Sequence, residues 1–140
     1  MCKKDRYFVR LDPEILGHET YTHESEDGTL RAWDVTVGNA IAQDGRPIEV
    51  FSLIDHEVTR EKIEQLYVNM DWEYAKTTDI TAPLLFIPLE NTILLIDGWH
   101  RLALASTLNL LEMPMFLLTQ EEADSILWLC LPPGHSALWR

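Results

Sequence analysis

The stretch ILLIDGWHRLALASTLNLL, residues 93–111, decides how we interpret the fold of this chain. Its first four residues, 93–96, are aliphatic, and a run this short is typical of an interior strand rather than of a buried helix. Asp97 and Gly98 interrupt the run. From His100 onward, leucines recur at the spacing of one helical face. The stretch therefore predicts a strand, a tight turn and a helix, in that order.

The turn between this strand and this helix has the features of an anion-binding site. Gly98 permits a tight turn or the close approach of a ligand. Trp99, His100 and Arg101 then lie in the first helical turn, where backbone N–H groups have no intrahelical partner and the helix dipole is positive. Arg101 can present two parallel donors to a phosphate, and His100 can donate or accept near neutral pH. The pattern predicts a phosphate site at residues 97–101.

Each of these residues also has a purely structural interpretation. Arg101 can pair with a carboxylate, of which this acidic chain has many, and His100 can hydrogen-bond to a backbone carbonyl at the helix start. Trp99 can simply be packed. The phosphate interpretation therefore requires that the amide end of the helix is open, and that the guanidinium is not turned away into a carboxylate pair.

The segment IDGWHRLALA, residues 96–105, resembles the strand–turn–helix signature of the ParB/sulfiredoxin superfamily. That signature has a small residue or Asp, then Gly, any residue, His or Arg, and Arg, before a helix rich in Ala and Leu. The resemblance continues through residues 112–117, which are similar to the Pro-containing strand that follows in the family, and back to a hairpin over 83–96. It covers residues 83–118. It implies a ParB/sulfiredoxin-like α+β fold, with a small mixed sheet and flanking helices, for residues 1–140 as a single domain.

Members of the superfamily use this turn for different chemistry. Sulfiredoxins place a catalytic Cys directly before the His-Arg pair, and because that position is Trp99 here, sulfinic-acid chemistry is excluded at this turn. ParB proteins hold the phosphates of CTP and carry a DNA-binding helix-turn-helix segment downstream, which we do not expect in this chain. The DG-x-HR turn resembles that of free serine kinases. As a lone ParB-like domain, this chain most resembles small plasmid-borne proteins of the Osa type, which in turn resemble nucleotide hydrolases and nucleases.

The resemblance implies a protein that binds a nucleotide or another phosphate-bearing molecule and hydrolyses or transfers its phosphate. The expected catalytic residues are Asp97, His100 and Arg101. The expected phosphate-binding or nucleotide-binding residues are Gly98, Trp99, His100 and Arg101, and Trp99 would also stack on a base or ribose.

Asp97 has two interpretations at the end of the predicted strand. It would hold Mg²⁺ together with a nucleoside triphosphate, or orient a water molecule. Its structural alternative is to cap the helix with its carboxylate. The sequence pairs no second carboxylate with Asp97, although three residues are candidates: Asp55, Glu57 and Glu90. A hydrolytic mechanism is therefore not established by the sequence.

Two other functions compete with nucleotide binding. One is a ParB-like protein without catalysis, whose acidic surface and Trp residues serve a protein partner or a homodimer. The other is a Mg²⁺-dependent nuclease. The chain has 11 Lys and Arg against 23 Asp and Glu, a net charge of −12, and no stripe of basic residues. Because such a surface repels nucleic acid, we do not expect nucleic acid as a partner.

The composition indicates a folded protein of the cytoplasm. With 140 residues, of which 46% are hydrophobic, the chain can bury a core as one domain. Its N-terminus has no apolar region of a secretory signal, and no apolar run approaches a membrane span. Cys2 and Cys130 are expected to be thiols in a reducing compartment. We therefore expect a cytoplasmic location and no membrane contact.

The polar segment 17–30 contains His18 and His23, which would be metal ligands in one interpretation. Their spacing fixes no convergent geometry, so we predict no metal site and favour a loop or a hairpin that turns at residues 27–28. The rest of the chain predicts strands at 6–11, 31–37, 47–54, 84–88, 92–96 and 113–118, helical turns at 13–16 and 38–43, an amphipathic helix at 58–75 capped by Thr59, a helix from Thr119 to residue 131 with Glu122 in a capping box, and a packed or dimer-forming tail at 134–140.

Overall fold

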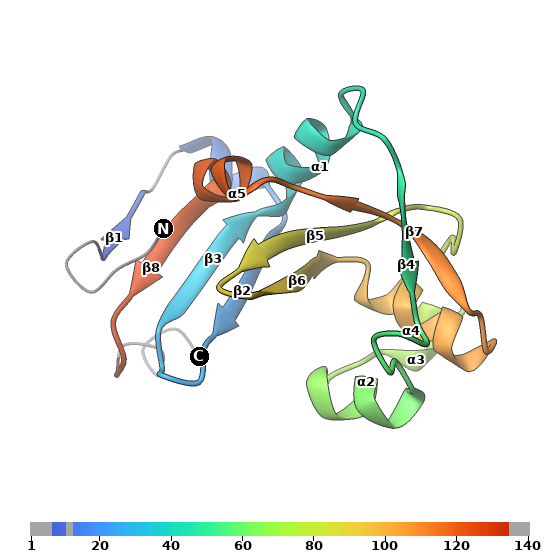
Figure 1. Cartoon of the computed structure of the whole chain (residues 1–140). Helices are drawn as coiled ribbons and strands as arrows, with labels where there is room; N and C mark the ends of the chain where they lie inside the picture. Colours follow the sequence, from blue (N-terminus) through green and yellow to red (C-terminus); the bar gives the residue numbers. More distant parts are fainter. Residues whose placement is uncertain (1–6, 11–12, 135–140) are drawn as a thin grey trace. The chain divides into compact units, whose positions relative to one another are not determined.

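The computed structural model of the chain describes residues 7–10 and 13–134 and has a mixed α+β fold, as predicted (Figure 1). The chain divides into two compact units, one formed by residues 1–44 together with 118–140 and the other by residues 45–117. Each unit contains a four-stranded sheet in its described part. None of the helices among the described residues combines the length and apolar character that a membrane-spanning segment needs.

The sheet of the first unit has the strand order β1-β8-β3-β2, and its neighbouring strands are antiparallel. The elements of this unit are β1 (Phe8–Val9), the 3-10 helix η1 (Pro13–Gly17), β2 (Thr20–Glu24), β3 (Leu30–Asp34), α1 (Val35–Gln43), α5 (Gln120–Ile126) and β8 (Leu127–Leu131). The predicted hairpin around residues 27–28 is confirmed, because β2 pairs with β3 across it. β3 is buried along its whole length, as expected for a strand inside the sheet.

Two predicted boundaries in this unit are wrong. The last helix ends at Ile126 rather than at residue 131, because the backbone becomes extended at Leu127 and pairs with β1 and β3 as strand β8. The strand predicted for 31–37 ends at Asp34, whose carboxylate accepts a hydrogen bond from the N–H of Val37 (3.1 Å) and caps α1. In contrast, the capping box between Thr119 and Glu122 is confirmed.

The histidines of the polar segment have ordinary structural surroundings. Nδ1 of His18 lies 2.7 Å from Oδ2 of Asp34, and His23 lies in β2 opposite Arg31 of β3. Cys130 is fully buried in β8 and is not a free thiol, which corrects the expectation made for it. Cys2 and the tail after residue 134 lie outside the described residues.

The second unit contains the strand–turn–helix predicted for residues 93–111. Its elements are β4 (Glu49–Ser52), α2 (Arg60–Leu66), α3 (Trp72–Ala75), β5 (Leu84–Leu89), β6 (Thr92–Asp97), α4 (Trp99–Thr107) and β7 (Glu112–Leu117). The sheet order is β4-β7-β5-β6; β5 and β7 are parallel, and the other pairs are antiparallel. The predicted hairpin and the strand after α4 are therefore confirmed. The core of this unit includes Leu84, Phe86 and Leu95 of the sheet and Leu102 and Ala105 of α4.

The amphipathic helix predicted for 58–75 is wrong as a single element. Thr59 caps α2 as predicted, but the helix ends at Leu66. A new helix, α3, starts after Asp71, whose carboxylate accepts a hydrogen bond from the N–H of Tyr74 (2.9 Å). Because a local Asp cap competes with continued helical hydrogen bonding, the chain restarts there and leaves Val68 80% exposed.

Candidate functional site

The helix α4 begins directly after β6 at a glycine with left-handed backbone geometry. Gly98 has φ 110° and ψ 17° and occupies the N-cap position, where it provides no side-chain hydrogen bond to the helix. The helical bonding begins when the N–H of Leu102 donates to the carbonyl oxygen of Gly98 at 2.9 Å. The backbone of residues 97–101 therefore forms the strand–turn–helix predicted from the sequence.

Close packing beneath and above Gly98 explains why this position is a glycine. A Cβ atom placed there would lie 2.6 Å from Cδ2 of Leu84 and 2.9 Å from Nη2 of Arg101. Both distances are shorter than real Cβ contacts allow. Leu84 is completely buried. The guanidinium of Arg101 consequently lies across the turn, at the amide end of α4.

Arg101 makes the carboxylate contact that was its structural interpretation, so the requirement that its guanidinium lies outside a carboxylate pair is not met in this structure. Its Nη2 lies 3.4 Å from Oδ2 of Asp97, and the Arg101 side chain is only 18% exposed. This separation is longer than the roughly 2.7–2.9 Å of a strong charge-assisted hydrogen bond. In addition, Nε of Arg101 is buried without a hydrogen-bond partner in the described part of the chain. The pair is therefore a loose one, and it leaves one donor of the guanidinium unsatisfied.

A second carboxylate whose charge interacts with that of Arg101 is Asp79, in the loop after α3. Oδ1 of Asp79 accepts hydrogen bonds from the hydroxyl (2.6 Å) and the N–H (2.9 Å) of Thr81. These bonds lower the pKa of Asp79 below its ordinary value, and the positive charge of Arg101 lowers this pKa further. Sequence reasoning missed Asp79, because no local pattern connects its loop to the start of α4.

The other two residues of the turn face aromatic side chains. The His100 ring meets the Tyr74 ring edge-on, with centroids 5.0 Å apart, and also contacts the Tyr67 ring at 5.9 Å. Trp99 packs against the core of the second unit, and its indole N–H donates to the carbonyl oxygen of Leu95 at 3.0 Å. The geometry therefore gives the Trp99 ring a packing role and offers no support for stacking on a base or ribose.

The structure brings Asp97, Gly98 and Arg101 together and separates them from the carboxylates that the sequence offered as partners. Glu57 lines a pocket with the last turn of α4, and the nine residues of α4 span about 13 Å. Glu90 lies in the turn between β5 and β6, one strand length from Asp97. Asp55 belongs to the same exposed loop as Glu57. None of these three residues is placed as a catalytic partner of Asp97.

The residues of the turn do not fit a magnesium ion. Mg²⁺ sites combine one or two carboxylates with substrate phosphates. Here the carboxylate of Asp97 already neighbours the guanidinium of Arg101, so a cation on the same oxygens would meet an adjacent positive charge. We therefore derive no catalytic step through a metal at this position.

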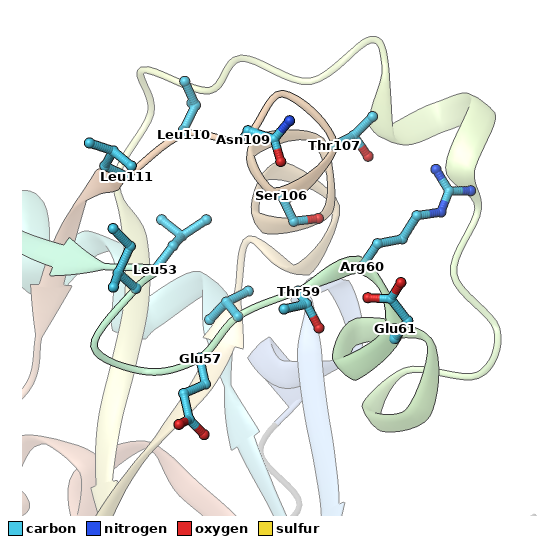
Figure 2. Close-up of a pocket in the computed structure, with 12 residues that line it drawn as sticks. Leu53, Glu57, Thr59, Arg60, Glu61, Ser106, Thr107, Asn109, Leu110 and Leu111 are labelled. Atoms are coloured by element: carbon cyan, nitrogen blue, oxygen red, sulfur yellow. The ribbon is translucent and has the colours of Figure 1, made fainter.

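A pocket of about 750 Å³ lies at the opposite, C-terminal end of α4 (Figure 2). One wall is the loop after β4 and the start of α2, with residues from 53–61. The other wall is the end of α4 and the following turn, with residues from 106–111. No local sequence pattern predicts this pocket, because the two segments that line it are distant in the chain.

Comparisons with protein-family models, with curated proteins and with solved structures found no match to this chain. The ParB/sulfiredoxin resemblance therefore stays a prediction that rests on the motif at residues 96–105 and on the elements next to it.

Proposed function

We propose that the turn at residues 97–101 binds the phosphate group of a nucleotide or of another small phosphate-bearing molecule, and that Arg101 exchanges Asp97 for this phosphate. The observation that carries the proposal is the position of the Arg101 guanidinium. It lies over Gly98 at the amide end of α4, with a buried, unsatisfied Nε and a carboxylate contact of 3.4 Å.

The exchange is favoured by the difference between a carboxylate and a phosphate. A phosphate carries more charge and can accept two parallel hydrogen bonds from the guanidinium. It would also meet the positive end of the α4 dipole, which contributes roughly 0.3–1 kcal/mol to anion binding at a helix N-terminus. A buried donor without a partner costs about 1–3 kcal/mol, and this cost is recovered only if the guanidinium shifts as it leaves Asp97, so that the phosphate reaches Nε.

Two carboxylates oppose the binding of an anion at this turn. Asp97 contacts Arg101 directly, and Asp79 is close enough for the charge of Arg101 to lower its pKa. Both carboxylates repel a phosphate, and Asp97 also competes with it for the guanidinium. We therefore expect the affinity to be set by how readily Arg101 leaves Asp97.

We limit the proposal to binding. The His100 ring contacts two tyrosine rings, and the described structure places no candidate carboxylate from the sequence beside Asp97. The reaction expected from the resemblance, hydrolysis or transfer of phosphate, remains a prediction without a catalytic pair. The nuclease alternative is opposed by the net charge of −12.

The proposal predicts opposite effects for the two partners of the ion pair. In a thermal-shift screen against ATP, CTP, GTP and inorganic phosphate, at least one ligand is expected to raise the melting temperature. Arg101→Gln is expected to lower the affinity for this ligand at least about tenfold, because it removes charge-assisted hydrogen bonds. Asp97→Asn is expected to raise the affinity for this ligand several-fold, because the competing negative charge is lost.

Arg60→Gln is the matched control for the loss of an arginine. Arg60 also lies in the second unit and also pairs with a carboxylate, Glu64, at 3.1 Å. Its replacement should leave the ligand affinity unchanged. If Asp97→Asn only destabilises the protein, and no phosphate ligand shifts the melting temperature of any variant, the Arg101–Asp97 pair is structural and the proposal is wrong.

A further inference from the structure

We infer that the pocket at the C-terminal end of α4 binds a segment of a partner protein in which apolar side chains alternate with lysine or arginine. This inference does not depend on the proposed phosphate site, which lies at the other end of the same helix. It rests on the shape, the exposed apolar residues and the charge of the pocket walls.

Backbone hydrogen bonds connect the segments that line the pocket. The N–H of Leu53 donates to the carbonyl oxygen of Leu111 at 2.9 Å and so joins the two walls. The N–H of Val58 donates to the carbonyl oxygen of Leu53 at 2.8 Å and closes the loop. Leu53 itself is only 3% exposed. The two segments that line the pocket are therefore joined by backbone hydrogen bonding.

The rim of the pocket exposes large apolar side chains. Ile54 on one wall is 63% exposed, and Leu111 on the other wall is 64% exposed. Small-molecule sites enclose most of the ligand surface, whereas contiguous apolar groups open to solvent are typical of protein–protein contacts. The exposed rim therefore favours a protein segment, which would cover these side chains, rather than a small molecule enclosed by the pocket.

The helix wall of the pocket offers hydrogen-bond acceptors. The hydroxyl groups of Ser106 and Thr107 donate to the carbonyl oxygen of Ala103, at 2.7 and 3.1 Å, so their oxygen lone pairs remain for a ligand. The C-terminal end of a helix also carries the negative end of its dipole. A ligand that donates hydrogen bonds or carries positive charge suits this wall.

The loop wall adds negative charge that its arginine does not balance. Arg60 donates from Nε to Glu64 at 3.1 Å, and its guanidinium lies 4.1 Å from the centre of the Trp72 ring. Arg60 is thus engaged by Glu64 and Trp72, and the same wall carries two exposed carboxylates, Glu57 and Glu61. With a net charge of −12, the whole chain also attracts basic partners over a distance.

Binding is tested with the full chain and a short fluorescein-labelled peptide in which leucine and lysine alternate, measured by fluorescence anisotropy. A peptide with glutamate in place of lysine and a peptide with serine in place of leucine are compared with it. We expect the leucine–lysine peptide to bind at least about tenfold more tightly than either, and added salt to weaken it. In ¹H–¹⁵N spectra, the signals that shift should belong to residues 53–61 and 106–111.

Variants at exposed positions separate this site from general attraction to an acidic protein. Two double variants should each lower the affinity for the leucine–lysine peptide about tenfold: Ile54→Ser with Leu111→Ser, and Glu57→Gln with Glu61→Gln. Leu66→Ser and Glu49→Gln are the controls, because Leu66 is 63% exposed and both residues lie outside the pocket lining. These controls should bind like the unmodified protein.

Several outcomes would overturn the inference. Equal binding of all three peptides, or equal losses in the control variants, would show attraction without a site. Signals that shift elsewhere would place the peptide on another surface. A dimer in sedimentation that Ile54→Ser with Leu111→Ser dissociates would make a second copy of this chain the occupant instead.

Discussion

Gly98→Ala is expected to lower the free energy of unfolding by about 3 kcal/mol, through backbone strain and steric overlap together. The φ of 110° at Gly98 is one that residues with a side chain rarely adopt. The new Cβ would also lie 2.6 Å from Cδ2 of the buried Leu84, which cannot move far. The change is measured by urea denaturation, followed through tryptophan fluorescence.

Gly45→Ala is the matched control for this substitution. Gly45 also has a positive φ, 79°, but no atom lies within 4 Å of a Cβ placed there. Its replacement should therefore cost only the backbone part, about 1 kcal/mol. Equal losses for the two variants would contradict the tight packing around Gly98, and a Gly98→Ala variant as stable as the unmodified protein would contradict the turn itself.

Leu84→Ala is expected to lower the free energy of unfolding by about 3 kcal/mol, because it removes a fully buried side chain and leaves a cavity. The losses of unfolding free energy caused by Leu84→Ala and Gly98→Ala should not be additive. Once Leu84 is truncated, the Cβ at position 98 loses its closest neighbour, and Gly98→Ala should then cost about 1.5 kcal/mol in that background.

The remaining close neighbour of that Cβ is the Arg101 guanidinium, whose Nη2 and Nε would lie at 2.9 and 3.2 Å from it. Because it is the end of a flexible side chain in a loose ion pair, it can shift at little cost. A double variant in which both losses simply add would show that Leu84 does not support the turn. The same denaturation measurements give this result.

Local signals explain what the sequence predicted well. The hairpin of β5 and β6, the glycine turn, α4 and β7 follow one another within residues 84–117, and each is marked by nearby residues. The aliphatic run 93–96 lies in β6, and a glycine follows this strand because a Cβ at position 98 would overlap Leu84 and Arg101. Thr59 and Thr119 mark helix starts for the same local reason, because the hydroxyl oxygen of each accepts a hydrogen bond from the backbone N–H three residues later.

Interactions between distant segments explain what the sequence did not predict. Residues 127–131 have a composition that also suits a helix, and only pairing with β1 and β3 makes them a strand. The site shows the same limit. The sequence left two possible partners for Arg101, a phosphate or a carboxylate. Tertiary structure determines three features of the second unit: the contact of Arg101 with Asp97, its electrostatic interaction with Asp79, and the pocket at the C-terminal end of α4.

The most direct test of phosphate binding at the turn is an NMR titration of the ¹⁵N-labelled chain with inorganic phosphate and with the nucleotide that stabilises it most. Phosphate binding at this turn is expected to move the backbone amide signals of Trp99, His100 and Arg101 and the Nε–H signal of Arg101 downfield together, with a single affinity, as these donors bind the phosphate oxygens. Signals that stay in place at this turn, while the Arg101–Asp97 pair persists at saturating ligand, would contradict it.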